Sequence, residues 1–179
     1  MTQPFAWLSL PAQKRLYCAS TIIAVGCLIA LLIQGAPLRN RVASNGILSL
    51  QLAFTEGRAR AVLASWSHLP RTAWLQIMID FPMLVAYPIA ISLGCAALSQ
   101  SLRGLRARVA LTCSWLVLFA GPLDLVEDLA SLRMLSHGVT AGLALTVGVC
   151  ASLKFLAVIP SLGYLVVARL RARSQQSVT

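Results

Sequence analysis

The sequence has few charged residues, and acidic residues are the rarest of them. Only five of the 179 residues are acidic and 11% are charged, whereas 58% are hydrophobic. Soluble globular domains carry about 25% charged residues. This shortage of charge excludes an ordinary soluble domain and predicts a membrane protein, with the lipid bilayer as its first partner.

The basic residues do not form a nucleic-acid binding patch. The net charge is +10, but these residues flank apolar runs in small groups and are not interleaved with aromatic residues. Proteins that bind nucleic acids gather positive charge on one face or along one helix. We therefore expect no nucleic-acid partner.

Paired cysteines are also missing. The five cysteines occur singly in apolar runs, and no C-x-x-C motif is present: Cys18, Cys27, Cys95, Cys113 and Cys150. This pattern excludes a disulfide framework and a zinc site, and it is typical of small side chains packed between helices. No serine or cysteine has a histidine at a spacing known from hydrolases, which argues against an enzyme that uses such a nucleophile.

Four long apolar runs are present, at about residues 16–38, 73–100, 109–132 and 139–168. Each is long enough to cross a hydrocarbon core of about 30 Å as a helix. Between the first two, residues 47–66 have the pattern of an amphipathic helix that lies on the membrane surface or caps the bundle. We predict an all-α fold, a four-helix transmembrane bundle with one extra surface helix, in a single membrane domain spanning residues 1–179.

Basic residues predict the orientation of this bundle. They concentrate in short flanks at Lys14 and Arg15, at residues 103–108 and at residues 169–173. Short flanks rich in lysine and arginine stay on the cytoplasmic side. We expect a multi-pass protein of a bacterial inner (plasma) membrane, with an uncleaved first helix and both termini in the cytoplasm.

Three of the five acidic residues share one face of the third crossing. Asp124, Glu127 and Asp128 follow the i, i+3, i+4 spacing of neighbours on a helix. Counted from the cytoplasmic flanks at about 1.5 Å per residue, Asp124 lies at the same height as Lys154 and Tyr87. Ions inside a membrane usually face the bundle interior and pair with one another. We therefore predict an ion pair between Lys154 and Asp124, with the Tyr87 hydroxyl as a further partner.

The other polar residues of the crossings lie about one helical turn higher. By the same count, Asp80, Glu127, Asp128 and Gln34 form a second layer near the outer interface. We expect the three carboxylates to lie just outside the ion pair. The predicted rim of the site consists of Gln34, Arg71, Arg133 and His137.

Several functions remain open at this point. The cluster could simply fix helix packing, but four carboxylates against one lysine favour binding of a proton, a cation or a small ligand, without catalysis. One alternative is an accessory subunit that docks on a larger membrane complex or on a second copy of itself. Another is a metal-dependent enzyme acting on lipid headgroups, with Asp80, Glu127, Asp128 and His137 as ligands. The sequence identifies neither a metal nor a cofactor.

Parts of the chain resemble a group of small bacterial integral membrane proteins with four crossings. The likeness rests on LQLAFTEGRARAVLASW (Leu50 to Trp66), DFPMLVAY (Asp80 to Tyr87), GPLDLVED (Gly121 to Asp128) and a lysine in the last helix. In that group the third helix reads D-x-x-E-N and an acidic residue precedes the surface helix; here Asp128 and Gln51 stand at those positions. The resemblance implies that Asp80, Tyr87, Asp124, Glu127 and Lys154 act together, and it implies no activity.

Overall fold

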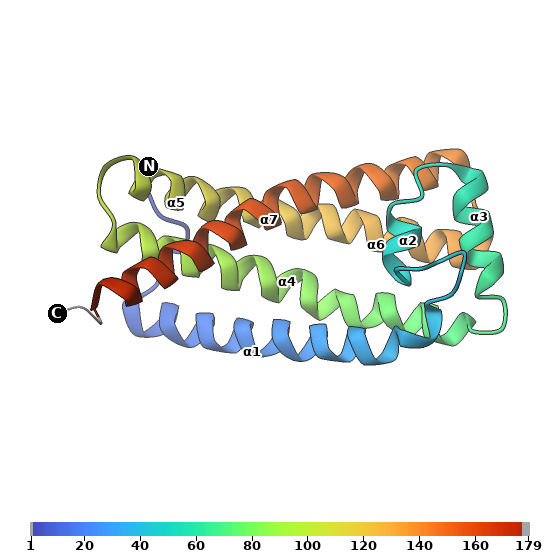
Figure 1. Cartoon of the computed structure of the whole chain (residues 1–179), viewed down its shortest axis with the longest axis horizontal. Coiled ribbons are helices and arrows are strands. Elements are labelled where there is room, and N and C mark those ends of the chain that lie inside the picture. Colours follow the sequence, from blue (N-terminus) through green and yellow to red (C-terminus); the bar gives the residue numbers. More distant parts are fainter. Residues whose placement is uncertain (1, 177–179) are drawn as a thin grey trace.

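The structure, a computed structural model, describes the backbone of residues 2–176 and the side chains of residues 2–170. Its elements are α1 (Leu10–Gln34), a 3₁₀ turn (Ala36–Leu38), α2 (Ile47–Gln51), α3 (Glu56–Ser65), α4 (Pro70–Ser101), α5 (Gly104–Leu116), a 3₁₀ turn (Val117–Phe119), α6 (Ala120–His137) and α7 (Ala141–Gln176) (Figure 1). No strand occurs within residues 2–176. The basic side chains at positions 171 and 173, used to predict orientation, lie outside the described part.

Four helical stretches are long and apolar enough to cross a membrane, which confirms the predicted fold class. They are α1, α4, the continuous path through α5 and α6, and α7. The third path contains one 3₁₀ turn, Val117–Phe119, where α5 passes into α6. These helices are compatible with a multi-pass membrane protein.

Helix α4 contains two prolines and still runs without interruption. Pro88 lacks the N–H that would bond to the carbonyl of Leu84 in the preceding turn. Gly121 lies against this carbonyl, so closely that a Cβ atom at position 121 would be 3.0 Å from the Leu84 oxygen. A glycine at this point lets α6 approach α4 closely, next to the acidic residues that follow it.

The predicted surface helix at residues 47–66 is two helices in the structure, α2 and α3. The break occurs at residues 52–55, where Phe54 adopts a left-handed backbone conformation with φ of 56°. Thr55 then caps α3 by accepting a hydrogen bond from the backbone N–H of Arg58 at 3.4 Å. Thr55 is a favourable residue for a helix start, so the chain restarts instead of continuing one helix.

The two short helices close one end of the bundle. We call α2, α3 and the preceding 3₁₀ turn the end cap. Ala59, Val62 and Trp66 of this cap are buried against α4, α6 and α7, and the indole N–H of Trp66 donates to the carbonyl oxygen of Leu38 at 2.8 Å. The amphipathic pattern was therefore an accurate sign of packing against the bundle.

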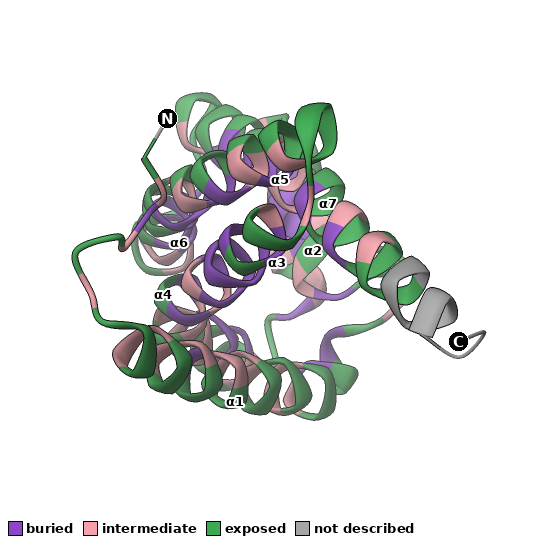
Figure 2. Cartoon of the chain, turned by 90° about the vertical axis from the view of Figure 1, so that its left-hand side faces the viewer, coloured by how far each residue is buried: buried purple, intermediate pink, exposed green. Residues whose placement is uncertain are grey.

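Helix α1 lies at the edge of the bundle. It packs along α4, and Ser20 is its one buried residue (Figure 2). Helices α1 and α7 lie apart at the capped end and approach each other toward the opposite end (Figure 1). There, the Arg169 guanidinium donates a hydrogen bond of 3.2 Å to the hydroxyl of Tyr17. The polar residues of the site lie on α4, α6 and α7, in the half of the bundle next to the end cap.

Candidate functional site

Lys154 of α7 lies at the centre of the polar cluster. Its ammonium forms an ion pair with Asp124 of α6, which confirms the predicted pair, and a second ion pair of 2.9 Å with the Oε2 atom of Glu127. All three side chains are buried. One lysine thus pairs with two carboxylates that are one helical turn apart on α6.

Asp124 has a second partner on α4. The hydroxyl of Tyr87 donates a hydrogen bond of 2.9 Å to the Oδ2 atom of Asp124, while Oδ1 accepts from Lys154. Residues that were placed at one height by counting along three separate helices therefore meet in the structure. Both oxygens of Asp124 are occupied, which fixes the orientation of this carboxylate.

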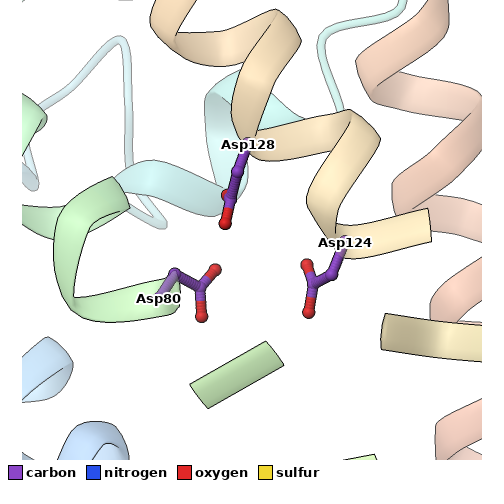
Figure 3. Close-up of side chains that lie close together, drawn as sticks. All are labelled: Asp80, Asp124 and Asp128. Carbon is purple, nitrogen blue, oxygen red and sulfur yellow. The ribbon is translucent and has the colours of Figure 1, made fainter. Parts of the chain in front are cut away.

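Asp80 and Asp128 lie beside this pair, but neither side chain forms a hydrogen bond or an ion pair with another described residue. One carboxylate oxygen from each of Asp80, Asp124 and Asp128 can be chosen so that the three atoms lie within 4.8 Å of one another (Figure 3). Asp128 is 2% exposed, and its Oδ2 atom has no hydrogen-bond partner among the described residues. The same holds for Oε1 of Glu127. A buried carboxylate oxygen without a donor is costly, so the arrangement lacks a positive or donating group.

Asp80 and Asp128 border a cavity of about 290 Å³ that is lined by α1, α4, α6 and α7 together with α2 and the connection before it. Its polar wall contains the side chains of Asp80, Tyr87, Asp124, Asp128 and Lys154. Its apolar wall is made by Leu28, Leu31 and Leu32 of α1, Met83 of α4, and Phe155 and Val158 of α7. The unpaired acids therefore face a space in which a ligand can sit.

Five further polar residues of the wall were not assigned to the site from the sequence: Arg39, Asn45, Gln51, Gln76 and Ser131. Gln51 and Gln76 are buried, and each stands in an apolar stretch. Ser131 follows Asp124 by seven residues, which is the same helical face. A polar residue inside an apolar run was the available signal for all three, whereas the loop residues Arg39 and Asn45 had none.

The predicted rim residues are mostly elsewhere. Arg71, Arg133 and His137 are exposed and do not line the cavity. Arg133 lies about 200° around the helix from Ser131, at 100° per residue, so it faces away from the acids. His137 contacts the hydroxyl of its neighbour Ser136, so it does not join the three carboxylates as a ligand. The predicted rim therefore shares only Gln34 with the surroundings of the cavity, through its contact with Gln76.

Gln34 contributes indirectly, through Gln76. The side-chain N–H groups of Gln76 donate to the carbonyl oxygen of Leu31 at 2.9 Å and to Oε1 of Gln34 at 2.8 Å. A Cβ atom on Gly35 would lie 2.7 Å from the backbone carbonyl oxygen of Leu31 and 2.9 Å from the Gln76 amide, so a larger residue there would force a shift. These contacts attach the end of α1 to α4 at the edge of the cavity.

The group of three carboxylates differs from the ligand set expected for a metal enzyme. Asp124 takes the place that Glu127 was expected to occupy, because Oε2 of Glu127 points to Lys154. The arrangement can hold one cation between two helices, next to a lysine and a tyrosine hydroxyl. Comparison with models of known families, with curated proteins and with solved structures gives no match, so the geometry of this site carries the functional argument.

Proposed function

We propose that this chain is a multi-pass protein of a bacterial inner membrane that binds a divalent cation at Asp80, Asp124 and Asp128. The observation that carries the proposal is the buried Oδ2 atom of Asp128, which has no donor among the described residues and belongs to the wall of a cavity. Oxygen atoms of carboxylates are the preferred ligands of hard cations such as Ca²⁺ and Mg²⁺. A bound cation would supply the missing partner of this atom.

The spacing of the three oxygens suits an ion of the size of Ca²⁺. Ca²⁺ lies about 2.3–2.6 Å from its ligands, so two oxygens on opposite sides of it are about 4.6–5.2 Å apart. The oxygens of Asp80, Asp124 and Asp128 lie within 4.8 Å of one another. Mg²⁺ requires ligands at about 2.0–2.1 Å in near-ideal octahedral geometry, whereas Ca²⁺ accepts a more flexible arrangement of carboxylates.

Charge balance also favours a divalent ion. Asp80, Asp124, Glu127 and Asp128 together exceed the single charge of Lys154 by three when all are ionised. A divalent ion removes most of this excess, and the alternative is that the carboxylates hold protons. An assembly clamp needs no such excess, because the Lys154 pair with Asp124 would suffice for it.

Thermal unfolding of the purified chain in a neutral detergent tests the proposal, with tryptophan fluorescence as the signal. After treatment with EDTA, Ca²⁺ at about 100 times its dissociation constant adds about 2.7 kcal/mol of stability. For a chain of this size, this corresponds to a midpoint increase of about 5–10 °C. Mg²⁺ and Mn²⁺ test selectivity, and Na⁺ controls for ionic strength.

Asp128→Asn is the decisive variant. It should abolish the shift with Ca²⁺, and in EDTA it should raise the midpoint, because removal of an unpaired buried charge adds about 1 kcal/mol of stability. Glu56→Gln is the matched control, since Glu56 is the one acidic residue outside the cluster and its pair with Arg60 is exposed. The cation site is excluded if no divalent ion changes the thermal unfolding midpoint of the chain, or if the Asp128→Asn variant responds to Ca²⁺ like the parent.

An accessory role is the second candidate, and the exposure of α1 favours it. Outside its contact with α4, this helix presents large apolar side chains, among them Ile22 and Ile33, each 72% exposed. Lipid or another membrane protein could cover them. Purification in a mild detergent followed by mass spectrometry tests this role, which predicts one stoichiometric protein partner.

A further inference from the structure

The cavity at the cation site is open toward the side of the bundle. Leu28 and Leu32 of α1 belong to its wall and are 45% and 53% exposed, respectively. Across the cavity, Phe155 and Val158 of α7 provide the opposite apolar wall. Helices α1 and α7 approach each other toward the other end of the bundle, where Arg169 bonds to Tyr17, and they lie farther apart at the end with the end cap (Figure 1).

The cavity is lined by two kinds of side chain. The polar ones are the three carboxylates, Lys154 and the buried amides of Gln51 and Gln76. The apolar ones include leucine, isoleucine, methionine, phenylalanine and valine side chains. A cavity of about 290 Å³ is much larger than a bare ion, and it is close to the lower limit of about 300 Å³ for small-molecule pockets. A molecule with a polar head and a hydrocarbon chain matches both kinds of side chain.

Arg39 is the arginine among the residues that line the cavity. It is exposed, and its Cγ atom lies 3.5 Å from the position that a Cβ atom of Gly46 would take. Arginine binds phosphate through two parallel N–H groups. Divalent ions held by carboxylates also use phosphate oxygens to complete their coordination. An ammonium head would instead compete with the cation for the same carboxylates and would be repelled by Arg39.

We propose that a phospholipid enters the cavity sideways between α1 and α7, with its phosphate bound to the cation of the Asp80, Asp124 and Asp128 site and to Arg39. This inference rests on the proposed cation site. The hydrocarbon chains lie along Leu28 and Leu32 and continue into the bilayer. The protein is then a cation-dependent receptor for a lipid with an anionic phosphate.

The experiment measures thermal midpoints of the full chain in dodecyl maltoside, with Ca²⁺ or with EDTA. The probes are dioleoylphosphatidylglycerol, dioleoylglycerol without phosphate, a dioleoyl lipid with a trimethylammonium head, and inorganic phosphate. Phosphatidylglycerol should raise the midpoint by about 5 °C beyond the effect of Ca²⁺ alone, and this increase should vanish in EDTA. Dioleoylglycerol, the cationic lipid and inorganic phosphate should produce no comparable increase.

Two pairs of variants test the route and the headgroup contact. Leu32→Trp narrows the opening and should reduce the lipid effect by at least about half while the Ca²⁺ effect stays, whereas Ile33→Trp, on the same helix but outside the cavity wall, should leave both unchanged. Arg39→Gln should weaken the effect of phosphatidylglycerol. Its matched control is Arg41→Gln, which removes an exposed charge outside the cavity wall. This control should leave the effect of phosphatidylglycerol unchanged.

Failures of the two proposals are distinguishable. A Ca²⁺ effect without any lipid effect overturns the lipid inference and leaves the cation site intact. Equal effects of phosphatidylglycerol and dioleoylglycerol overturn phosphate recognition, and an effect of inorganic phosphate as large as that of the lipid makes the free anion the ligand. A lipid effect that persists in EDTA overturns the role of the cation, and equal losses in Leu32→Trp and Ile33→Trp overturn the lateral route.

Discussion

The two halves of this bundle differ in their buried polar groups: one contains charged groups around a cavity, and the other contains hydroxyl groups that pair with one another. In the half below the end cap, here called the acidic half, Asp80, Asp124, Asp128 and Lys154 line a cavity, and Glu127 is buried against Lys154. In the other half, here called the serine half, Ser92 of α4 lies 3.1 Å from the hydroxyl of Ser114 on α5, and that hydroxyl donates to the carbonyl oxygen of Ser92 at 2.8 Å. Both serines are fully buried.

The serine half shows what helix packing alone requires. Ser161 of α7 bonds to the carbonyl of Ala157, one turn earlier in its own helix, at 2.7 Å, and the neighbouring Cys95, Ala110 and Leu165 fill the remaining space. No buried side-chain oxygen of this half lacks a partner among the described residues. Hydroxyl groups thus join α4 to α5, and Ser161 also donates to the carbonyl oxygen of Cys113 on α5 at 3.4 Å, all without any charge. The acidic half contains more charge than helix packing requires, which is why we propose that its charges bind a ligand.

The largest expected effect is that of Lys154→Met in the acidic half. This variant leaves Asp124 and Glu127 buried without a cation, and breaking a buried ion pair on one side costs about 3–5 kcal/mol. The free energy of unfolding, measured by titration with SDS in detergent, should fall by that amount. Glu56→Gln is the matched control, because it removes the charge from an ion pair with Arg60 that is largely exposed and contributes at most about 1 kcal/mol.

A compensating variant separates charge from packing. If the loss comes from uncompensated carboxylates, Lys154→Met combined with Asp124→Asn and Glu127→Gln should recover most of the stability. A triple variant as unstable as Lys154→Met would show that the lysine acts through its packing, and the contrast between the two halves would then not be one of charge.

The sequence was sufficient to predict the centre of the acidic half. The ion pair and the Tyr87 contact followed from counting residues along straight helices, because an apolar helix that crosses a membrane fixes the height of each side chain. The two predicted layers form one cluster in the structure, since Lys154 reaches Glu127, one turn above Asp124. A flexible lysine stem spans more than one layer, so residue counting could not resolve them.

Rotation about the helix axes and the loops were harder to predict. Arg133 is exposed and faces away from the acids, and the rotation of a helix is decided by its neighbours, not by its own composition. The wall residues Arg39 and Asn45 lie in a connection whose path depends on Trp66 bonding to Leu38. Such contacts between residues distant in sequence leave no local pattern.

Gly148→Leu should give an intermediate effect, through the end cap of the acidic half. A Cβ atom at this position would lie 2.6 Å from Cδ1 of Phe54, the residue with a left-handed backbone between α2 and α3. Inserting a larger side chain into a packed contact costs about 1–3 kcal/mol. Hydrogen exchange in residues 47–66 should accelerate as Phe54 is displaced.

Gly142→Leu is the control for this substitution on the same helix, because nothing lies within 4 Å of its Cβ position. It should leave the end cap unchanged and improve the helix propensity of α7 by up to about 1 kcal/mol. Equal exchange rates in the two variants would show that Phe54 does not hold the end cap in place, and the cavity would then be less enclosed than the structure indicates.

The smallest expected effect belongs to the serine half. Ser114→Ala removes both contacts with Ser92, and polar contacts between membrane helices contribute about 0.6 kcal/mol on average. The free energy of unfolding should therefore fall by about this amount, with Thr112→Ala, at an exposed position of the same helix, as the unaffected control. The increase in midpoint with Ca²⁺ should be the same as in the parent chain. A reduced Ca²⁺ effect in Ser114→Ala would mean that α4 transmits changes between the two halves, because Ser92 and Asp80 lie on that one helix.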